Sequence, residues 1–125
     1  GQFQQTSTTS YTTASITPTA GNRLLVAGLG GSRASDNNGT VTGWTNSFTA
    51  IADIGTTAGS TDDLIGVAYL LVTANGSTSY STGGTYSGVA QQAKTGLIIS
   101  FKEAAAAGKA PPIFHRPLKF RTLYR

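Results

Sequence analysis

The chain has 125 residues, enough for one domain with its own hydrophobic core, and it contains no cysteine, which excludes structural disulfides and thiolate catalysis. Its formal net charge is +4, but the excess lies in residues 102–125, which carry six Lys or Arg residues against Glu103. The rest of the chain is close to neutral, so we expect no nucleic-acid partner, and no apolar run reaches the ~20 residues that a membrane span needs.

Short strand patterns separated by turn-forming residues follow one another along the chain. Apolar runs of strand length, alternating or continuous, occur at residues 11–17, 23–30, 48–55, 64–73 and 95–101. One or two weaker strands are expected within residues 77–88. This pattern is typical of an all-β fold, and it predicts a single antiparallel β-sandwich over residues 1–102. The expected type is jelly-roll or immunoglobulin-like, with about seven or eight strands.

The three strongest strand patterns also predict which side chains face the core. Successive side chains of a strand point to opposite faces, so alternate positions should share one environment. We expect the following alternate positions to face inward: Leu24, Val26, Ile65, Val67, Tyr69, Leu97, Ile99 and Phe101.

The C-terminal end of the sequence differs from the rest. An Ala-rich linker is expected at residues 103–110, followed by a basic, aromatic arm at residues 111–125. The arm has too many large apolar groups for a solvated tail, and its three prolines reduce the entropy lost on ordering. We therefore expect the arm to lie extended on another protein. The expected contact residues are Phe114, Arg116, Leu118, Lys119, Phe120, Arg121, Tyr124 and Arg125.

Groups suited to catalysis are scarce in this sequence. The single histidine, His115, lies in the arm, where nothing is expected to hold it against a nucleophile, so we expect no catalytic residues and no enzyme activity. The pair Asp62 and Asp63 lacks the spacing of a calcium loop, and we expect neither a metal nor a cofactor. Three aromatic residues either pack in the core or stack on a sugar ring: Trp44, Tyr80 and Tyr86.

Four short motifs resemble a known group of proteins. The segments "AGNRLLVAGL", "GW", "GVAYLLVT" and "GLIISFK" are similar to those of small β-sandwich domains in tailed-bacteriophage virion proteins, such as head decorations, tail fibres and appendages. The resemblance covers residues 11–102 and does not extend to the arm.

The resemblance implies a non-enzymatic structural protein of a phage particle, present as a capsid decoration or as a tail or neck appendage. The expected partners are other virion proteins, contacted through residues 111–125, in a homo-oligomeric or multi-copy assembly. The expected location is the virion, with the host cytoplasm during assembly. The alternative is a carbohydrate- or receptor-binding module that attaches the particle to the host surface.

Overall fold

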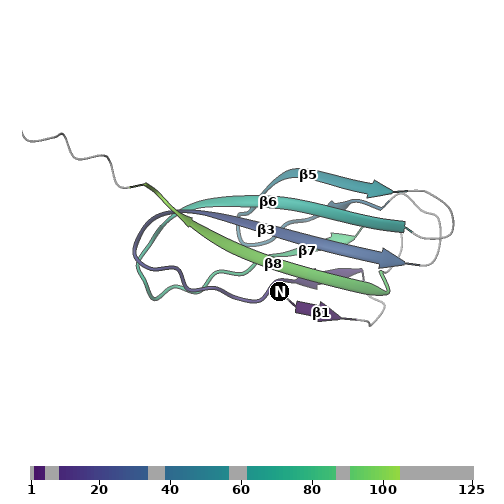
Figure 1. Ribbon diagram of the computed structural model, residues 1–125, viewed down its shortest axis with the longest axis horizontal. Helices are drawn as coiled ribbons and strands as arrows, with labels where there is room; N and C mark the ends of the chain where they lie inside the picture. Colours follow the sequence, from purple (N-terminus) through teal and green to yellow (C-terminus); the bar gives the residue numbers. More distant parts are fainter. Residues whose placement is uncertain (1, 5–8, 34–38, 57–61, 87–90, 105–125) are drawn as a thin grey trace, which may run out of the picture.

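The computed structural model describes residues 2–4, 9–33, 39–56, 62–86 and 91–104. These residues form an all-β structure of two antiparallel sheets, consistent with a β-sandwich, as the sequence predicts (Figure 1). Within the described residues, the larger sheet has the strand order β1 (Gln2–Gln4), β8 (Ala93–Lys102), β3 (Gly21–Arg33), β6 (Asp62–Ala74) and β5 (Thr49–Thr56). The smaller sheet has the order β2 (Ser10–Thr12), β7 (Gly83–Tyr86) and β4 (Val41–Thr42).

The long strands β3 and β6 form the centre of the larger sheet. They pair in one unbroken register, from Gly21 opposite Ala74 to Arg33 opposite Asp62. On its other side β3 pairs with β8, and on the far side of β6 the edge strand β5 carries a bulge between Ala50 and Ala52. Because the register is continuous, every second residue of β3, β6 and β8 faces the same side of the sheet.

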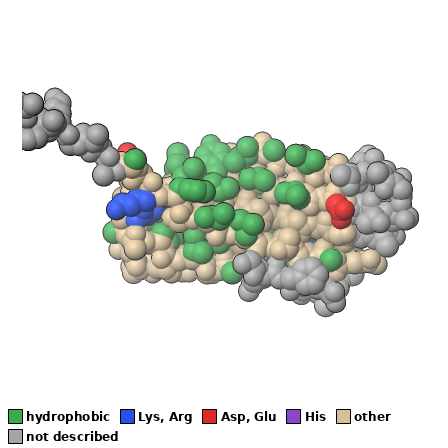
Figure 2. Space-filling view, in the orientation of Figure 1, with side chains coloured by type: hydrophobic (Ala, Val, Ile, Leu, Met, Phe, Trp, Pro, Cys, Tyr) green, Lys and Arg blue, Asp and Glu red, His purple; other side chains and the backbone are tan. Residues whose placement is uncertain are grey.

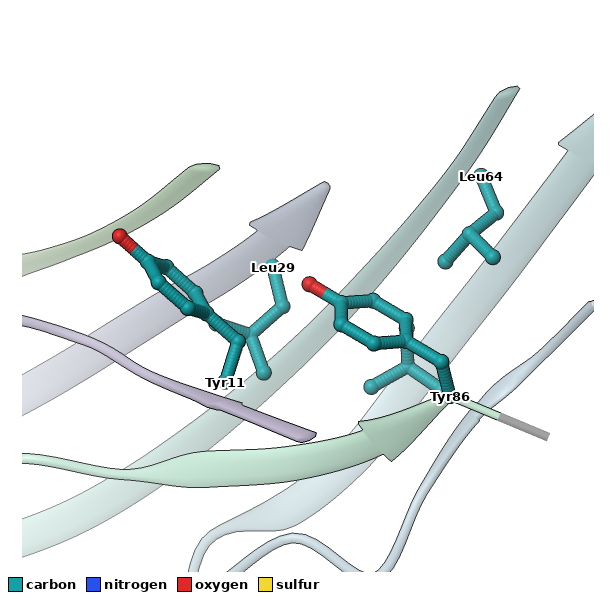
Figure 3. Packing of buried hydrophobic residues seen from close by; sticks show 5 residues of the cluster. Tyr11, Leu29, Leu64 and Tyr86 are labelled. Carbon is teal, nitrogen blue, oxygen red and sulfur yellow. The ribbon is translucent and has the colours of Figure 1, made fainter. Parts of the chain in front are cut away.

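The hydrophobic core lies between the two sheets in two clusters. Figure 3 shows the first, in which the rings of Tyr11 and Tyr86 from the smaller sheet lie over Leu29 and Leu64 of the larger one. Val41 of β4 completes this cluster. The second cluster consists of four buried residues: Leu25, Ala27, Phe48 and Ala68. Trp44 packs against both clusters.

The predicted direction of the side chains was wrong for the strongest strands. The inward residues of β3 are Leu25, Ala27 and Leu29, which are fully buried. The residues predicted to face inward are instead exposed or half-buried, with 58% exposure for Ile65 and 51% for Phe101. The whole predicted set lies on the side of the sheet that faces away from the core: Leu24, Val26, Ile65, Val67, Tyr69, Leu97, Ile99 and Phe101.

Side-chain size explains this reversal. Both faces of β3 and β6 are apolar, so alternation alone does not identify the inner face. The inner face carries small residues where the smaller sheet lies closest, and a Cβ added at Gly66 would lie 2.4 Å from Cβ of Val41. At these positions of β6 the larger apolar side chains lie on the outside, while Leu25, Leu29 and Leu64 fill the two clusters on the inner face.

Tyr86 joins the two sheets and gives the fold a pH-dependent component. Its ring is 1% exposed, and its hydroxyl donates a hydrogen bond of 3.0 Å to the carbonyl oxygen of Gly30. Burial, with a smaller effect of Tyr11, raises the pKa of Tyr86 far above its ordinary value. The folded state therefore favours the protonated ring, and this contribution to stability is complete below about pH 10 and declines as the pH rises further.

We expect Tyr86→Phe to lower the free energy of unfolding by about 1 kcal/mol at neutral pH, because the carbonyl of Gly30 loses its donor. The variant should also lose less stability than the wild type between pH 9 and pH 11. Urea unfolding of both proteins across this range measures the difference. An equal alkaline loss in the two proteins would contradict the assignment to Tyr86.

Candidate interaction surface

The larger sheet exposes an apolar surface on the side away from the core. We call this surface the outer face and define it by its large apolar side chains: Leu24, Val26, Ile54, Ile65, Val67, Tyr69, Leu71, Leu97, Ile99 and Phe101. Figure 2 shows these hydrophobic groups gathered over β5, β6, β3 and β8. Single exposed apolar residues are common, whereas a contiguous apolar patch makes this face the candidate interaction surface of the described residues.

The strand registers arrange the outer face in four rows that cross the strands. Two rows have a large side chain on β3, and they consist of Phe101, Leu24 and Leu71, and of Ile99, Val26 and Tyr69. The other two rows have a glycine on β3, and they consist of Leu97, Gly28 and Val67, and of Thr95, Gly30, Ile65 and Ile54. Along β3, the outer face is therefore raised by side chains at Leu24 and Val26 and is low at Gly28 and Gly30.

Two hollows lie on the outer face, one at each end of β3. The first has a volume of about 580 Å³ and is lined by Leu24, Leu71 and Phe101 together with polar residues at the end of the sheet. The second, of about 310 Å³, lies over Gly30 and Gly31, with Ile65 among its walls. Gly30 contributes to the second hollow because it faces this side and places no side chain above the backbone of β3.

Within the described residues, no charged side chain occupies the four rows, and the charged groups nearest to the outer face lie at its ends. Lys102 and Glu103 lie at the end that carries Phe101, where Nδ2 of Asn22 donates a hydrogen bond of 2.8 Å to Oε2 of Glu103. Asp63 lies at the opposite end, beside the second hollow. Figure 2 shows the blue and red groups at the two ends, with the hydrophobic groups between them. A partner that covers the rows therefore has few charges to desolvate.

Lys94 lies on the inner side of β8 and is also one of the residues that line the second hollow. Its side chain is buried, and Nζ donates to the backbone oxygen of Gln91 at 3.4 Å. Burial lowers the pKa of Lys94. The contact with Gln91 makes Lys94 a support for the turn that precedes β8.

The structure places the three aromatic candidates for glycan binding in or near the core. Tyr86 is buried in the first cluster, and its ring has no free side for a sugar. Trp44 is half-buried against both clusters. Tyr80 is also half-buried, and its backbone pairs with that of Ile16. These aromatic residues do not form an exposed platform, so the glycan alternative gains no structural support.

The other candidate residues of the sequence fall in a different part of the chain. All of the expected contact residues of the arm, from Phe114 to Arg125, lie outside the described residues, as does His115. The described residues contain no group of three His, Cys, Asp or Glu side chains placed to hold a metal ion. In the same part of the chain, no helix has the length and apolar character of a membrane-spanning segment.

Sequence reasoning named most residues of the outer face but gave them the wrong environment. A signal was available in the segment Leu64–Thr73, where apolar residues occupy both sets of alternate positions. Such a strand is apolar on both sides and is typical of a sheet covered on both faces. The second apolar side of this segment therefore pointed to a second contact surface.

Comparison with known proteins adds no family to this description. Scans of the chain against protein-family models, curated proteins and solved structures found no match.

Proposed function

We propose that this chain is a non-enzymatic structural subunit of a multi-copy assembly, and that the assembly is a phage particle. The observation that carries the proposal is the outer face, whose large apolar side chains have exposures of 45% for Leu97 and 69% for Leu71. Leaving such a surface in water is unfavourable by roughly 25 cal/mol per Å² of apolar area. A domain built in this way is stabilised when another protein covers the face.

The chemistry of the outer face supports a structural role over catalysis. Catalytic sites bring together a few polar groups whose pKa values are matched to proton transfer. Among the described residues, the hollow over Gly30 is lined by aliphatic residues together with Ser32, Asp63, Lys94 and Thr95. The hollow beside Phe101 has its polar groups at the end of the sheet, where Asn22 and Glu103 already bond to each other. Both hollows suit apolar side chains of a partner.

We also propose that the fold is of the jelly-roll type and not immunoglobulin-like. The support comes from nested pairing, because β1 pairs with β8, β2 with β7 and β3 with β6. Winding one long hairpin of strands around a common core gives this order, as in the double Greek key of a jelly roll. The departure is β5, which pairs with β6 at the edge of the larger sheet.

The arm at residues 111–125 supplies the proposed anchor to capsid, tail or neck subunits. From Leu118 the sequence alternates in part between apolar and basic side chains, which suits an extended segment bound along one side. Phe120 and Tyr124 would fill pockets of the partner, and Arg121 would pair with its acidic groups. The sandwich would then lie on the outside of the virion.

The test is the presence of the chain in purified particles. We expect it in stoichiometric amount, and we expect removal of residues 111–125 to leave the strand content of the purified protein unchanged while the particles lose it. A matched control replaces the surface residue Thr12 with Ser and should be incorporated at the wild-type level. Incorporation of the truncated protein at full occupancy would contradict the anchor, and absence of the full chain from particles would contradict the proposed function.

A further inference from the structure

We propose that the outer face pairs with the outer face of a second copy of this chain, related by a two-fold axis that lies between the two facing sheets and runs across the strands, parallel to the rows. This inference rests on the proposed function, because it takes the outer face as an assembly surface, and it names the partner. Three features of the face carry it: its size, its self-complementary relief and the placement of its charges.

The size of the outer face is sufficient for a weak dimer. Four strands at about 4.8 Å spacing and eight residue steps of about 3.3 Å along β8 give a flat area of about 500 Å² per copy. Two copies would together bury roughly 1,000 Å² or more, which is the lower limit of specific protein interfaces. We therefore expect a dimer that forms at micromolar concentrations and dissociates on dilution.

The relief of the outer face is complementary to itself under this two-fold axis. An axis in the interface plane, parallel to the rows and midway between the rows of Val26 and Gly28, places the row of Leu24 over the partner's row of Gly30, and the row of Val26 over the partner's row of Gly28. Each raised half thus meets a low half, and the large side chains beside Phe101 enter the partner's hollow over Gly30. Stacked sheets interdigitate their side chains in this way at about 10 Å separation.

The charges of the outer face fit the same arrangement. The end with Lys102 and Glu103 in one copy lies over the end with Asp63 in the other, and the four rows between these ends are uncharged among the described residues, so the contact buries no charge there. A parallel arrangement would instead place equal ends together and set the raised halves against each other. The antiparallel arrangement, in which opposite ends meet, is thus favoured by shape.

Sedimentation equilibrium of the full chain tests the inference. We expect the wild type to be a dimer at tens of micromolar and a monomer well below one micromolar. Val67→Asp, close to the axis, should weaken association at least 100-fold, because it places two carboxylates together in an apolar contact. The control Thr12→Asp, on the exposed side of β2, should dimerise like the wild type. Circular dichroism checks that each variant keeps its strands.

A charge-pairing experiment separates this dimer from other occupants of the face. Val67→Asp and Val67→Lys should each be monomeric, and their equimolar mixture should recover dimers, because the two charges meet across the axis. If Val67→Asp loses its strand signal, Ile65→Asp carries the same dissociation test at a position with 58% exposure.

Three outcomes would overturn the inference. They are a wild type that stays monomeric at high concentration, a dimer that persists in the Val67 variants, and a mixture of Val67→Asp and Val67→Lys that does not recover dimers.

If the wild type is monomeric, Phe120→Asp distinguishes two other occupants of the outer face, the chain's own arm and a different subunit. Binding of a hydrophobic dye to the face rises in this variant only if the arm had covered it. Presence in particles would still support the proposed function, so the failures of the two proposals are distinguishable.

Discussion

Leu64→Asp is expected to unfold the domain, whereas Ile65→Asp, one residue further along β6, should leave it folded. Leu64 is 3% exposed and packs in the cluster of Leu29 and Tyr86, so an aspartate there loses its hydration without gaining a cation. A buried, uncompensated charge costs several kcal/mol, which is a large part of the stability of a small domain. At Ile65 the new carboxylate stays in water.

Circular dichroism and urea unfolding of the two variants measure this contrast. Ile65→Asp should stay within about 1 kcal/mol of the wild type, because a surface substitution removes few contacts. Leu64→Ala provides a milder form of the core change and should cost about 2–5 kcal/mol. A folded Leu64→Asp protein beside an unfolded Ile65→Asp protein would reverse the assignment of the inner and outer faces.

Gly66→Ala is expected to destabilise the domain by about 1–3 kcal/mol, the usual range for an overpacked site. The added methyl group would lie 2.4 Å from Cβ of Val41 and 2.7 Å from its Cγ2. Val41 belongs to β4 of the smaller sheet, so relief of this clash requires the two sheets to separate locally.

The matched control is Gly28→Ala on the outer face. The nearest side-chain atom to its new methyl group would be Cγ of Leu97 at 3.7 Å, an ordinary van der Waals contact. We expect this variant to unfold within about 0.5 kcal/mol of the wild type, because alanine also suits a strand better than glycine. Equal losses at the two glycines would contradict the close approach of the sheets as the cause of the loss at Gly66.

The existence of the main strands could be predicted from sequence because their apolar runs are long and bounded by turns. The run at residues 64–73 corresponds to β6, and the run at 95–101 corresponds to β8. The short strands β1 and β4 have too few residues to produce a pattern. Their positions depend on pairing with distant strands, which no local signal contains.

The choice of inner face could not be made from alternation because both sets of positions are apolar. Size was the missing criterion on β6, where Gly66 and Ala68 occupy the inner positions at the approach of the smaller sheet. On β3 size does not separate the faces, because Leu25 and Leu29 lie on the inner side. The preference for large inward residues follows from hydrophobic burial alone and ignores the space between the sheets. An apolar strand with small residues on one side and large ones on the other therefore favours two contact surfaces.

The candidate site was only partly accessible to sequence reasoning. Trp44 and Tyr86 were equally compatible with core packing and with a glycan platform, and only their burial separates the two. The outer face was missed because its residues were assigned to the core. The arm at residues 111–125 lies outside the described residues, and its role stays a prediction.

Thiol labelling of single-cysteine variants is the most direct measurement of the central claim that the outer face is a contact surface. The chain contains no cysteine, so one introduced thiol reports on one position. In the full chain, Ile65→Cys should react rapidly with a thiol reagent in dilute solution and more slowly as protein concentration rises, while Leu64→Cys should react slowly at every concentration. A reaction rate at Ile65→Cys that does not change with concentration, or a faster reaction at Leu64→Cys, would contradict the account.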